Sequence, residues 1–182
     1  MPPIVAVNEK IVGLDLPTVT IDGYHAAKEI VRYLVGLGHR RLGHISGPAD
    51  KTSSAADRLQ GFHDILEESN LELTWIFSTE YSMESGALAS RERITLPERP
   101  TAVFCSCDEV AVGFNSALWR NGSRVPRDVG ALGFDDVPLA EFSIPSLTAI
   151  RQTPLEIGIQ AVRLLLKLIQ NPNETPESVF LK

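Results

Sequence analysis

The sequence predicts an α/β fold of doubly wound parallel sheets, because short apolar segments alternate along the chain with longer segments of helical periodicity. The short segments are continuously apolar, as in "VGALGF", rather than alternately apolar and polar. Continuous apolar strands are typical of parallel sheets that helices cover on both faces. Ligands of such sheets bind beyond the carboxyl ends of the strands, so residues at those ends are candidate functional residues.

Strands are expected in the apolar segments that turn residues bound on both sides. They are residues 3–8, 18–22, 42–46, 75–78, 101–106, 129–134 and 148–152. A further strand begins in "VFLK" at the end of the chain.

Amphipathic periodicity predicts helices between these strands. They cover residues 25–38, 54–69, 82–93, 108–122 and 154–171. Ser82 and Asp108 are candidate amino-terminal caps, and Gly38 is suited to the left-handed backbone that ends a helix. Pro154 is suited to a first helical turn.

The composition excludes several classes of protein. A chain of 182 residues suffices for one core or for one lobe of a larger protein. No apolar run reaches the roughly 18–20 residues of a membrane helix, and the first residues do not form a signal peptide. The net charge of −6 disfavours direct binding to nucleic-acid phosphates. Cys105 and Cys107 are expected to be reduced thiols in or near a core, as is typical of a cytoplasmic protein.

Motifs of the common enzyme classes are missing from the sequence. It contains neither of the glycine-rich phosphate-binding motifs and no nucleophile elbow. The four histidines lack the spacing of metal ligands. A receiver domain would carry its acid pair after an early strand, whereas here the pair follows a late one. We therefore predict no enzyme activity, no cofactor and no metal site, which leaves a binding role.

The acid pair of "GFDD" ends a predicted buried strand. Asp135 and Asp136 can hold a metal, perform acid–base chemistry, cap a turn or bind the hydroxyls of a ligand. Arg58, Tyr81 and Gln152 are expected at the same edge, and such side chains recognise sugars and nucleosides. Each also has a structural explanation, such as an ion pair for Arg58 or a turn cap for Asp135, and spacing alone does not decide between them.

Several longer stretches carry a family resemblance, among them "DGYHAAKEIVRYLVGLGHRRLGHISGP", "DRLQGFHDILEESNL" and "RPTAVFCSCDEVAVGFNSALWRNGSRVPRDVGALGFDDVPLAEFSIPSLTAIRQ". In this combination the chain resembles the effector-binding region of the lac/gal/purine repressor family of bacterial transcription regulators. The resemblance spans nearly the whole chain in order. It implies the fold of a periplasmic binding protein of type I, in which two α/β lobes close around a ligand.

On that plan the chain corresponds to one complete lobe and part of the other. Residues 1–40 are expected in the amino-terminal lobe and residues 41–152 in the carboxyl-terminal lobe. The helix at 153–171 returns to the amino-terminal lobe, and 172–182 begin a closing segment. The helix-turn-helix that family members carry ahead of this region is absent from the chain, so we expect a fragment of a longer regulator.

The resemblance also implies roles for individual residues. Arg58 matches the arginine with which the family binds vicinal hydroxyls. Asp135 matches the carboxylate that accepts hydrogen bonds from ligand hydroxyls or ring nitrogens. Asp136 and Asp108 are expected to be structural, as caps of a turn and a helix.

Four further positions match ligand contacts of the family. Asn8 stands where many members have Asp, Tyr81 where members place a stacking aromatic residue, and Gln152 at a crossover between the lobes. Cys107 stands where sugar-responsive members often have Asn, which argues against a simple hexose. The expected effector-binding residues, with two hydroxyls of a neighbouring loop, are Asn8, Thr52, Ser54, Arg58, Tyr81, Cys107, Asp135 and Gln152.

The function implied is that of the effector-binding and dimerisation region of a cytoplasmic DNA-binding repressor. A small molecule such as a sugar or a nucleoside or purine would reorient the lobes at crossovers near residues 38–42 and 150–153, and so change operator affinity. Operator DNA would be bound through the missing helix-turn-helix. The whole protein would be a homodimer, and Phe114 and Trp119 are candidates for the contact between its subunits. The alternatives are a sugar-binding protein of an ABC transporter and an enzyme that uses the acid pair.

Overall fold

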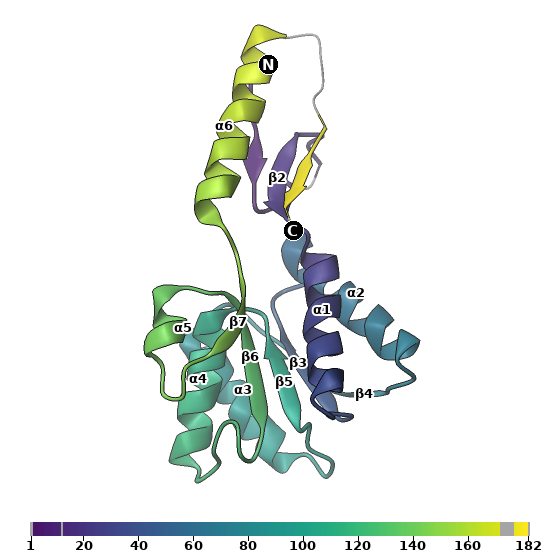
Figure 1. The fold of residues 1–182 in the computed structure, drawn as a ribbon, viewed down its shortest axis with the longest axis vertical. Helices are drawn as coiled ribbons and strands as arrows, with labels where there is room; N and C mark the ends of the chain where they lie inside the picture. The colour runs from purple at the N-terminus through teal and green to yellow at the C-terminus, as the bar shows by residue number, and fades with distance from the viewer. Residues whose placement is uncertain (1, 12, 172–176, 182) are drawn as a thin grey trace.

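The computed structural model describes residues 2–11, 13–171 and 177–181. These residues form two lobes, each built on its own parallel sheet, and a long helix rises beside the smaller one (Figure 1). The predicted α/β class with parallel sheets is confirmed.

The large lobe contains a five-stranded sheet in the order β4-β3-β5-β6-β7, and all its pairs are parallel. The chain starts this sheet near its middle, moves out to β4 and then returns to build the other side, which is doubly wound topology. The strands are β3 (Leu42–Ser46), β4 (Leu73–Ser78), β5 (Ala102–Cys105), β6 (Gly130–Asp135) and β7 (Thr148–Arg151).

Helices cover both faces of this sheet. The helices are α1 (Gly23–Gly36), α2 (Ser53–Glu68), α3 (Met83–Thr95), α4 (Asp108–Arg120) and the short α5 (Pro138–Phe142). Successive residues of β5 point to opposite faces, as strand geometry requires. Val103 and Cys105 pack with α3 and α4, whereas Ala102 and Phe104 pack with α1 and α2. The continuous apolar strands of the sequence therefore reflect burial from both sides.

The small lobe has a three-stranded parallel sheet in the order β1-β2-β8. Its strands are β1 (Ala6–Val7), β2 (Thr18–Ile21) and β8 (Val179–Leu181), and α6 (Pro154–Gln170) packs on them through Ile157 and Leu164. The predicted closing segment at 172–182 lies partly outside the described residues, and β8 is its described strand.

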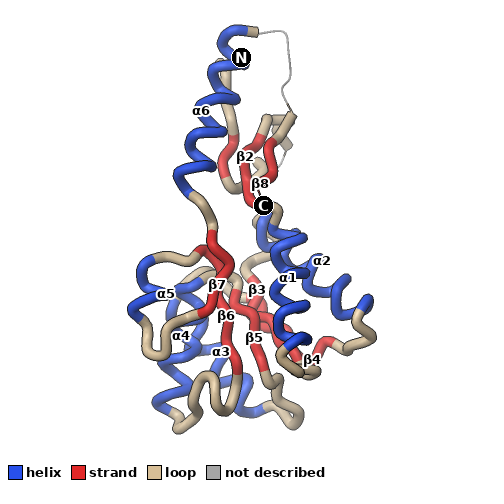
Figure 2. Tube along the Cα trace, in the orientation of Figure 1, coloured by secondary structure: helices blue, strands red, loops and turns tan. Residues whose placement is uncertain are grey.

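The position of α1 differs from the sequence prediction, which placed residues 1–40 together in the smaller lobe. The apolar stripe of α1, which includes Ile30 and Leu34, is buried against Phe62 of α2 and Leu42 of β3. Residues 38–42 therefore lie inside the large lobe and are not the crossover that we expected. The chain instead crosses at residues 21–23, between β2 and α1, and again between β7 and α6, where Figure 2 shows the strand continuing toward the small lobe.

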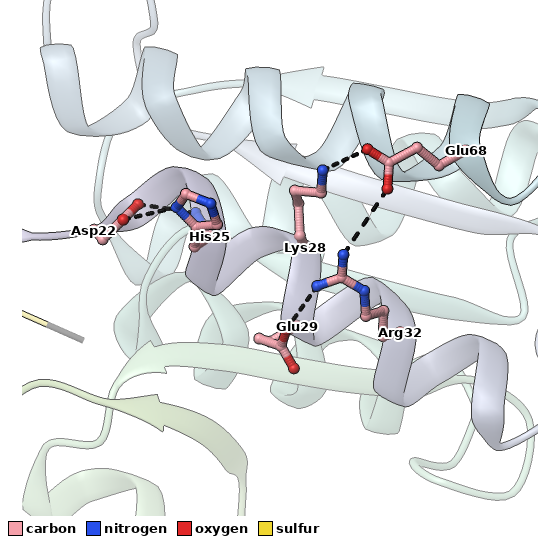
Figure 3. Close-up of polar contacts among 6 residues, drawn as sticks. All are labelled: Asp22, His25, Lys28, Glu29, Arg32 and Glu68. Atoms are coloured by element: carbon pink, nitrogen blue, oxygen red, sulfur yellow. Dashed lines mark hydrogen bonds and ion pairs between the residues drawn. The ribbon is translucent and has the colours of Figure 1, made fainter.

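Polar side chains also join α1 to α2 on the outer side of the large lobe (Figure 3). Lys28 of α1 forms an ion pair with Glu68 of α2, and the Lys28 side chain is only 10% exposed. Arg32 of α1 lies between Glu29 and the same Glu68. At the start of α1, Asp22 accepts a hydrogen bond from the backbone N–H of His25 and so caps the helix.

Most predicted helices and strands lie within a few residues of the observed ones. One helix was missed, and one of the two predicted amino-terminal caps is wrong. The helix α5 was not predicted, because its segment contains prolines and reads as a loop. Ser82 caps α3 as predicted, by accepting from the backbone N–H of Ser85 at 3.1 Å. Asp108 does not cap α4, since it is the first residue of the helix and Cys107 occupies the cap position.

Candidate functional site

A cavity of about 450 Å³ lies between the two lobes. Its walls come from the ends of strands in both sheets and from the segments that cross between them, where doubly wound folds place their ligands. Seven of the eight residues predicted for effector binding line this cavity. They are Asn8, Ser54, Arg58, Tyr81, Cys107, Asp135 and Gln152.

Arg58 is held in place by three contacts. Its Nη2 donates to the hydroxyl of Tyr81 at 3.0 Å and to Ser54 Oγ at 3.3 Å. The guanidinium group also lies over the ring of Phe134, 4.5 Å from the centroid. Arg58 is only 6% exposed, although it is always charged. It therefore does not form the surface ion pair that the sequence left open, and its charge faces the cavity.

Tyr81 is positioned by the absence of a side chain at Gly47. A Cβ atom on Gly47 would lie 2.3 Å from the Tyr81 hydroxyl, so only glycine leaves room for this ring. The ring lies at the cavity wall, and its hydroxyl accepts a hydrogen bond from Arg58.

Asp135 and Gln152 form a pair that spans the end of β6 and the crossover to α6. The side-chain amide of Gln152 donates to Asp135 Oδ1, and the backbone N–H of Gln152 donates to the Asp135 carbonyl at 3.1 Å. Burial raises the pKa of Asp135, although the Gln152 hydrogen bond and the charge of Arg58 act in the opposite direction. The φ of Asp135 is +114°, a strained value for a residue with a side chain. Strain of this kind is often kept where a side chain must face a binding site.

The neighbouring acids hold the loop that follows β6. Asp136 pairs with Arg151 of β7, outside the cavity lining. Asp108 Oδ2 accepts from the backbone N–H of Val137 at 2.8 Å and so ties α4 to the same loop. Burial, together with the charges of Asp135 and Asp136, raises the pKa of Asp108 to about 6. Both acids therefore have structural contacts, as expected, but Asp108 holds the loop after β6 and is not the cap of α4.

Asn8 and Cys107 complete the predicted set from opposite lobes. Asn8 follows β1 with a φ of +67°, a backbone conformation that asparagine tolerates better than most residues. Cys107 precedes α4 and is a free thiol whose pKa burial raises to about 11. A thiol with so high a pKa is protonated at neutral pH, so it contributes a small, nearly apolar surface to the cavity.

Thr52 does not line the cavity, in contrast to the prediction. It occupies the cap position of α2, and its hydroxyl donates to the Pro48 carbonyl at 3.3 Å. The hydroxyl is therefore used within its own loop.

Sequence reasoning missed other lining residues, which are Glu9, Thr20, Ile21, Gly23, Ser106, Asp108, Glu109, Phe134 and Val137. Most are direct neighbours of predicted residues at strand ends, so the strand-end rule applied to every position would have found them. Glu9 is the most important omission. Its partners Ser53 and Ser54 lie 44 and 45 residues further along the chain, and no local pattern connects them.

The cavity is suited to binding a small hydroxyl-rich molecule. It offers carboxylate, amide and hydroxyl groups, one guanidinium group, and the apolar faces of Phe134 and Val137. Within residues 2–11, 13–171 and 177–181, no cluster of three His, Cys, Asp or Glu side chains is arranged to hold a metal ion. Among the same residues, no helix is both long and apolar enough to span a membrane.

Sequence comparison identifies the relatives of this chain. The profile of the periplasmic binding protein-like domain family matches residues 31–182. The chain is 39% identical over 164 residues to the ribose operon repressor of Haemophilus influenzae, covering 89% of this chain and 48% of that protein. It is 40% identical over 172 residues to the transcriptional repressor CytR of Escherichia coli K12, covering 93% of this chain and 50% of that protein. The chain thus spans about half the length of these curated relatives.

Several solved structures of transcriptional regulators have the same fold. A putative LacI transcriptional regulator from Bacillus cereus subsp. cytotoxis superposes with a TM-score of 0.92 at 30% identity, covering 99% of this chain and 64% of that one. A LacI family regulator from Enterococcus faecium with bound ribose superposes with a TM-score of 0.87 at 26% identity, covering 98% of this chain and 66% of that one. The lac repressor dimer bound to operator superposes with a TM-score of 0.88 at 25% identity, covering 98% of this chain and 62% of that one.

Proposed function

Because the chain belongs to the periplasmic binding protein-like domain family, we propose that it is the effector-binding region of a DNA-binding transcriptional repressor. The single observation that carries this proposal is the cavity between the lobes, lined by Arg58 and Asp135 of one lobe and Asn8 of the other. A molecule that contacts both lobes binds one of their relative arrangements better than another. Binding therefore shifts the population of arrangements, which is the basis of allosteric control.

The charges of the cavity favour an uncharged effector. Among the described residues that line the cavity, Arg58 is the one cation, whereas Glu9, Asp108, Glu109 and Asp135 are acidic. Arg58 already donates to Tyr81 and Ser54. A phosphate or carboxylate group would face like charges in a partly enclosed site, which is costly. We infer that the effector is a neutral sugar or nucleoside-like compound. It is bound by the seven predicted residues that line the cavity, without Thr52.

The partners follow from the relatives. The lac repressor structure is a dimer bound to operator, and the curated relatives are about twice as long as this chain. We propose that the whole protein binds operator DNA through a helix-turn-helix outside this chain, acts as a homodimer in the cytoplasm, and catalyses no reaction.

An exposed apolar surface on the large lobe is a candidate for the dimer contact. A second hollow is lined by residues of α4, α5 and the loop after α5, including Trp119, Leu139 and Ile144. Trp119 is 58% exposed and Ile144 is 92% exposed, whereas Phe114 is fully buried in the core. Phe114 therefore belongs to the fold, and Trp119 remains the candidate for a contact with a second copy.

The effector class is tested by calorimetric titration with matched compounds. D-ribose and uridine serve as neutral probes, and D-ribose 5-phosphate and uridine 5′-monophosphate as their anionic counterparts. We expect a neutral compound to bind and its phosphate ester to bind at least about 100-fold more weakly, a difference of about 3 kcal/mol. Tighter binding of the esters would contradict an uncharged effector.

The transporter alternative is less favoured, because the relatives named above are repressors. The two functions differ in what the bound compound changes. In a repressor, the neutral compound that binds should change the affinity of the intact protein for its operator. A transport protein would bind the same compound with no effect on DNA.

A further inference from the structure

Glu9 joins the two lobes directly. It follows Asn8 in the small lobe, and its carboxylate reaches the start of α2 in the large lobe. Its Oε2 accepts from Ser53 Oγ at 2.9 Å and from the backbone N–H of Ser54 at 3.1 Å, and its Oε1 accepts from Ser54 Oγ. The backbone N–H of Lys10 adds a bond to Ser53 Oγ at 3.1 Å. Four hydrogen bonds thus connect two adjacent residues of one lobe with two of the other.

The helix that receives Glu9 has no cap of its own. Thr52 occupies the cap position but makes no capping hydrogen bond, and the first turn of α2 contains no acidic residue. The first N–H groups of a helix need acceptors and favour a nearby negative charge. Glu9 supplies both from the opposite lobe.

The electrostatic setting keeps Glu9 charged. Burial alone would raise its pKa, but the hydrogen bonds from Ser54 and Ser53, together with the charge of Arg58, outweigh burial and hold the pKa below its ordinary value. The contact also extends into the cavity, because Ser54 Oγ accepts from Arg58 Nη2. Glu9 therefore helps to place Ser54, and Ser54 helps to place Arg58.

We propose that Glu9 is a latch that caps α2 across the cleft, and that it controls how closely the lobes approach and how Ser54 and Arg58 are placed. The covalent crossings at residues 21–23 and between β7 and α6 leave the lobes able to rotate. The Glu9 contact is a separate, noncovalent connection on the cavity wall, and it opposes that rotation. This role depends on the two-lobe fold and not on the identity of the effector.

The test compares substitutions that separate charge from reach, made in the intact protein. E9Q keeps the length of the side chain and removes its charge, whereas E9D keeps the charge and shortens the side chain by one methylene. S53A removes two of the four bonds without altering a cavity-lining residue. E72Q is the matched control, because Glu72 is an exposed glutamate of the large lobe.

Two measurements detect the contact between Glu9 and α2 in the absence of any effector. Amide hydrogen exchange measures protection of the first turn of α2, and spin labels at R163C and E98C measure the distance between the lobes. In E9Q and E9D we expect exchange in that turn to accelerate about 2- to 30-fold, the range that loss of a helix cap supports. The distance distribution should broaden toward longer values. S53A should show a smaller effect, E9Q/S53A no more than E9Q, and E72Q none.

The outcomes are decisive in both directions. Wild-type exchange and distances in both E9Q and E9D would overturn the latch. A change in E9Q alone would also overturn it, since the charge of the cavity and not the reach to α2 would then be responsible. Because no effector is added, failure here leaves the proposed effector-binding function standing, and the reverse also holds.

Discussion

Asp135 and Asp136 are adjacent in the chain, yet they contact different parts of the structure. Asp135 lines the cavity and is bonded to Gln152, whereas Asp136 pairs with Arg151 outside it. A turn in which both residues have positive φ separates the two side chains. At the scale of single residues, backbone conformation thus assigns one carboxylate to the cavity and the other to the loop.

Cys107 provides a test of the cavity wall at this scale. Burial raises the pKa of its thiol from 9.0 to about 11, which lowers the thiolate fraction about 100-fold at pH 8. We expect iodoacetamide to alkylate Cys107 at least about 100-fold more slowly in the native protein than in urea, as followed by mass spectrometry. A native rate within tenfold of the unfolded rate would contradict this description of the thiol.

The sequence was most informative about residues whose role depends on their own strand or helix. Arg58, Asp135 and Gln152 lie near strand ends or a helix start, so the fold class made them candidates and the family resemblance assigned their roles. Glu9 gave no such signal, because its role depends on a contact between lobes that only the folded chain brings together. Thr52 was misplaced because a hydroxyl at a helix start is equally suited to a bond within its own loop.

Among the elements, β3 shows how burial from both sides affects a titratable side chain. His44 is fully buried in this strand, and its ring stacks against the rings of Phe62 of α2 and Phe104 of β5. Burial lowers its pKa from 6.5 to about 3, although a hydrogen bond with the Phe104 carbonyl acts in the opposite direction. The ring is therefore neutral in the folded protein throughout the ordinary pH range.

A pH dependence of stability follows from this element. The unfolded chain binds a proton at His44 below pH 6.5 and the folded chain does not until about pH 3, so stability falls as the pH drops through this window. Between pH 7 and pH 5 the loss should be about 2 kcal/mol. The pKa of Asp108 is raised to about 6, so protonation of Asp108 partly offsets the loss. The informative quantity is therefore the difference in pH dependence between the wild type and a variant that lacks His44.

Urea unfolding at pH 7 and pH 5 measures this difference. H44F should remove about 2 kcal/mol of the pH-dependent change, although it also loses the hydrogen bond to Phe104. H25Q, which removes a surface imidazole, should retain the change. An equal pH dependence in H44F and in the wild type would show that His44 is not the buried neutral group described here.

The sequence was least informative about which lobe an element belongs to. The pattern of α1 correctly predicted a helix, but a helix with one apolar stripe packs equally well on either sheet. Its placement depends on packing against Leu42 of the next strand and against Phe62 of α2, which no pattern within the helix itself reveals. The short α5 was missed for a different reason, because a five-residue helix carries too few periodic positions to be recognised.

The whole molecule is organised around the space between its lobes. Two chain crossings and the Glu9 contact connect the lobes, and the cavity is lined by residues from each of them. An effector bound there would contact both sheets at once, so its binding energy can alter their relative arrangement. This geometry connects the roles of individual residues with the regulatory function that we propose.

The measurement that tests the central claim most directly is calorimetric titration of D135N and D136N with the neutral compound that binds best. Both substitutions remove one carboxylate and keep a residue that tolerates positive φ, but only Asp135 lines the cavity. Loss of a buried charged hydrogen bond costs about 2 kcal/mol or more, so D135N should bind at least about 30-fold more weakly. D136N should stay within about twofold of the wild type, and wild-type affinity in D135N would contradict binding in this cavity.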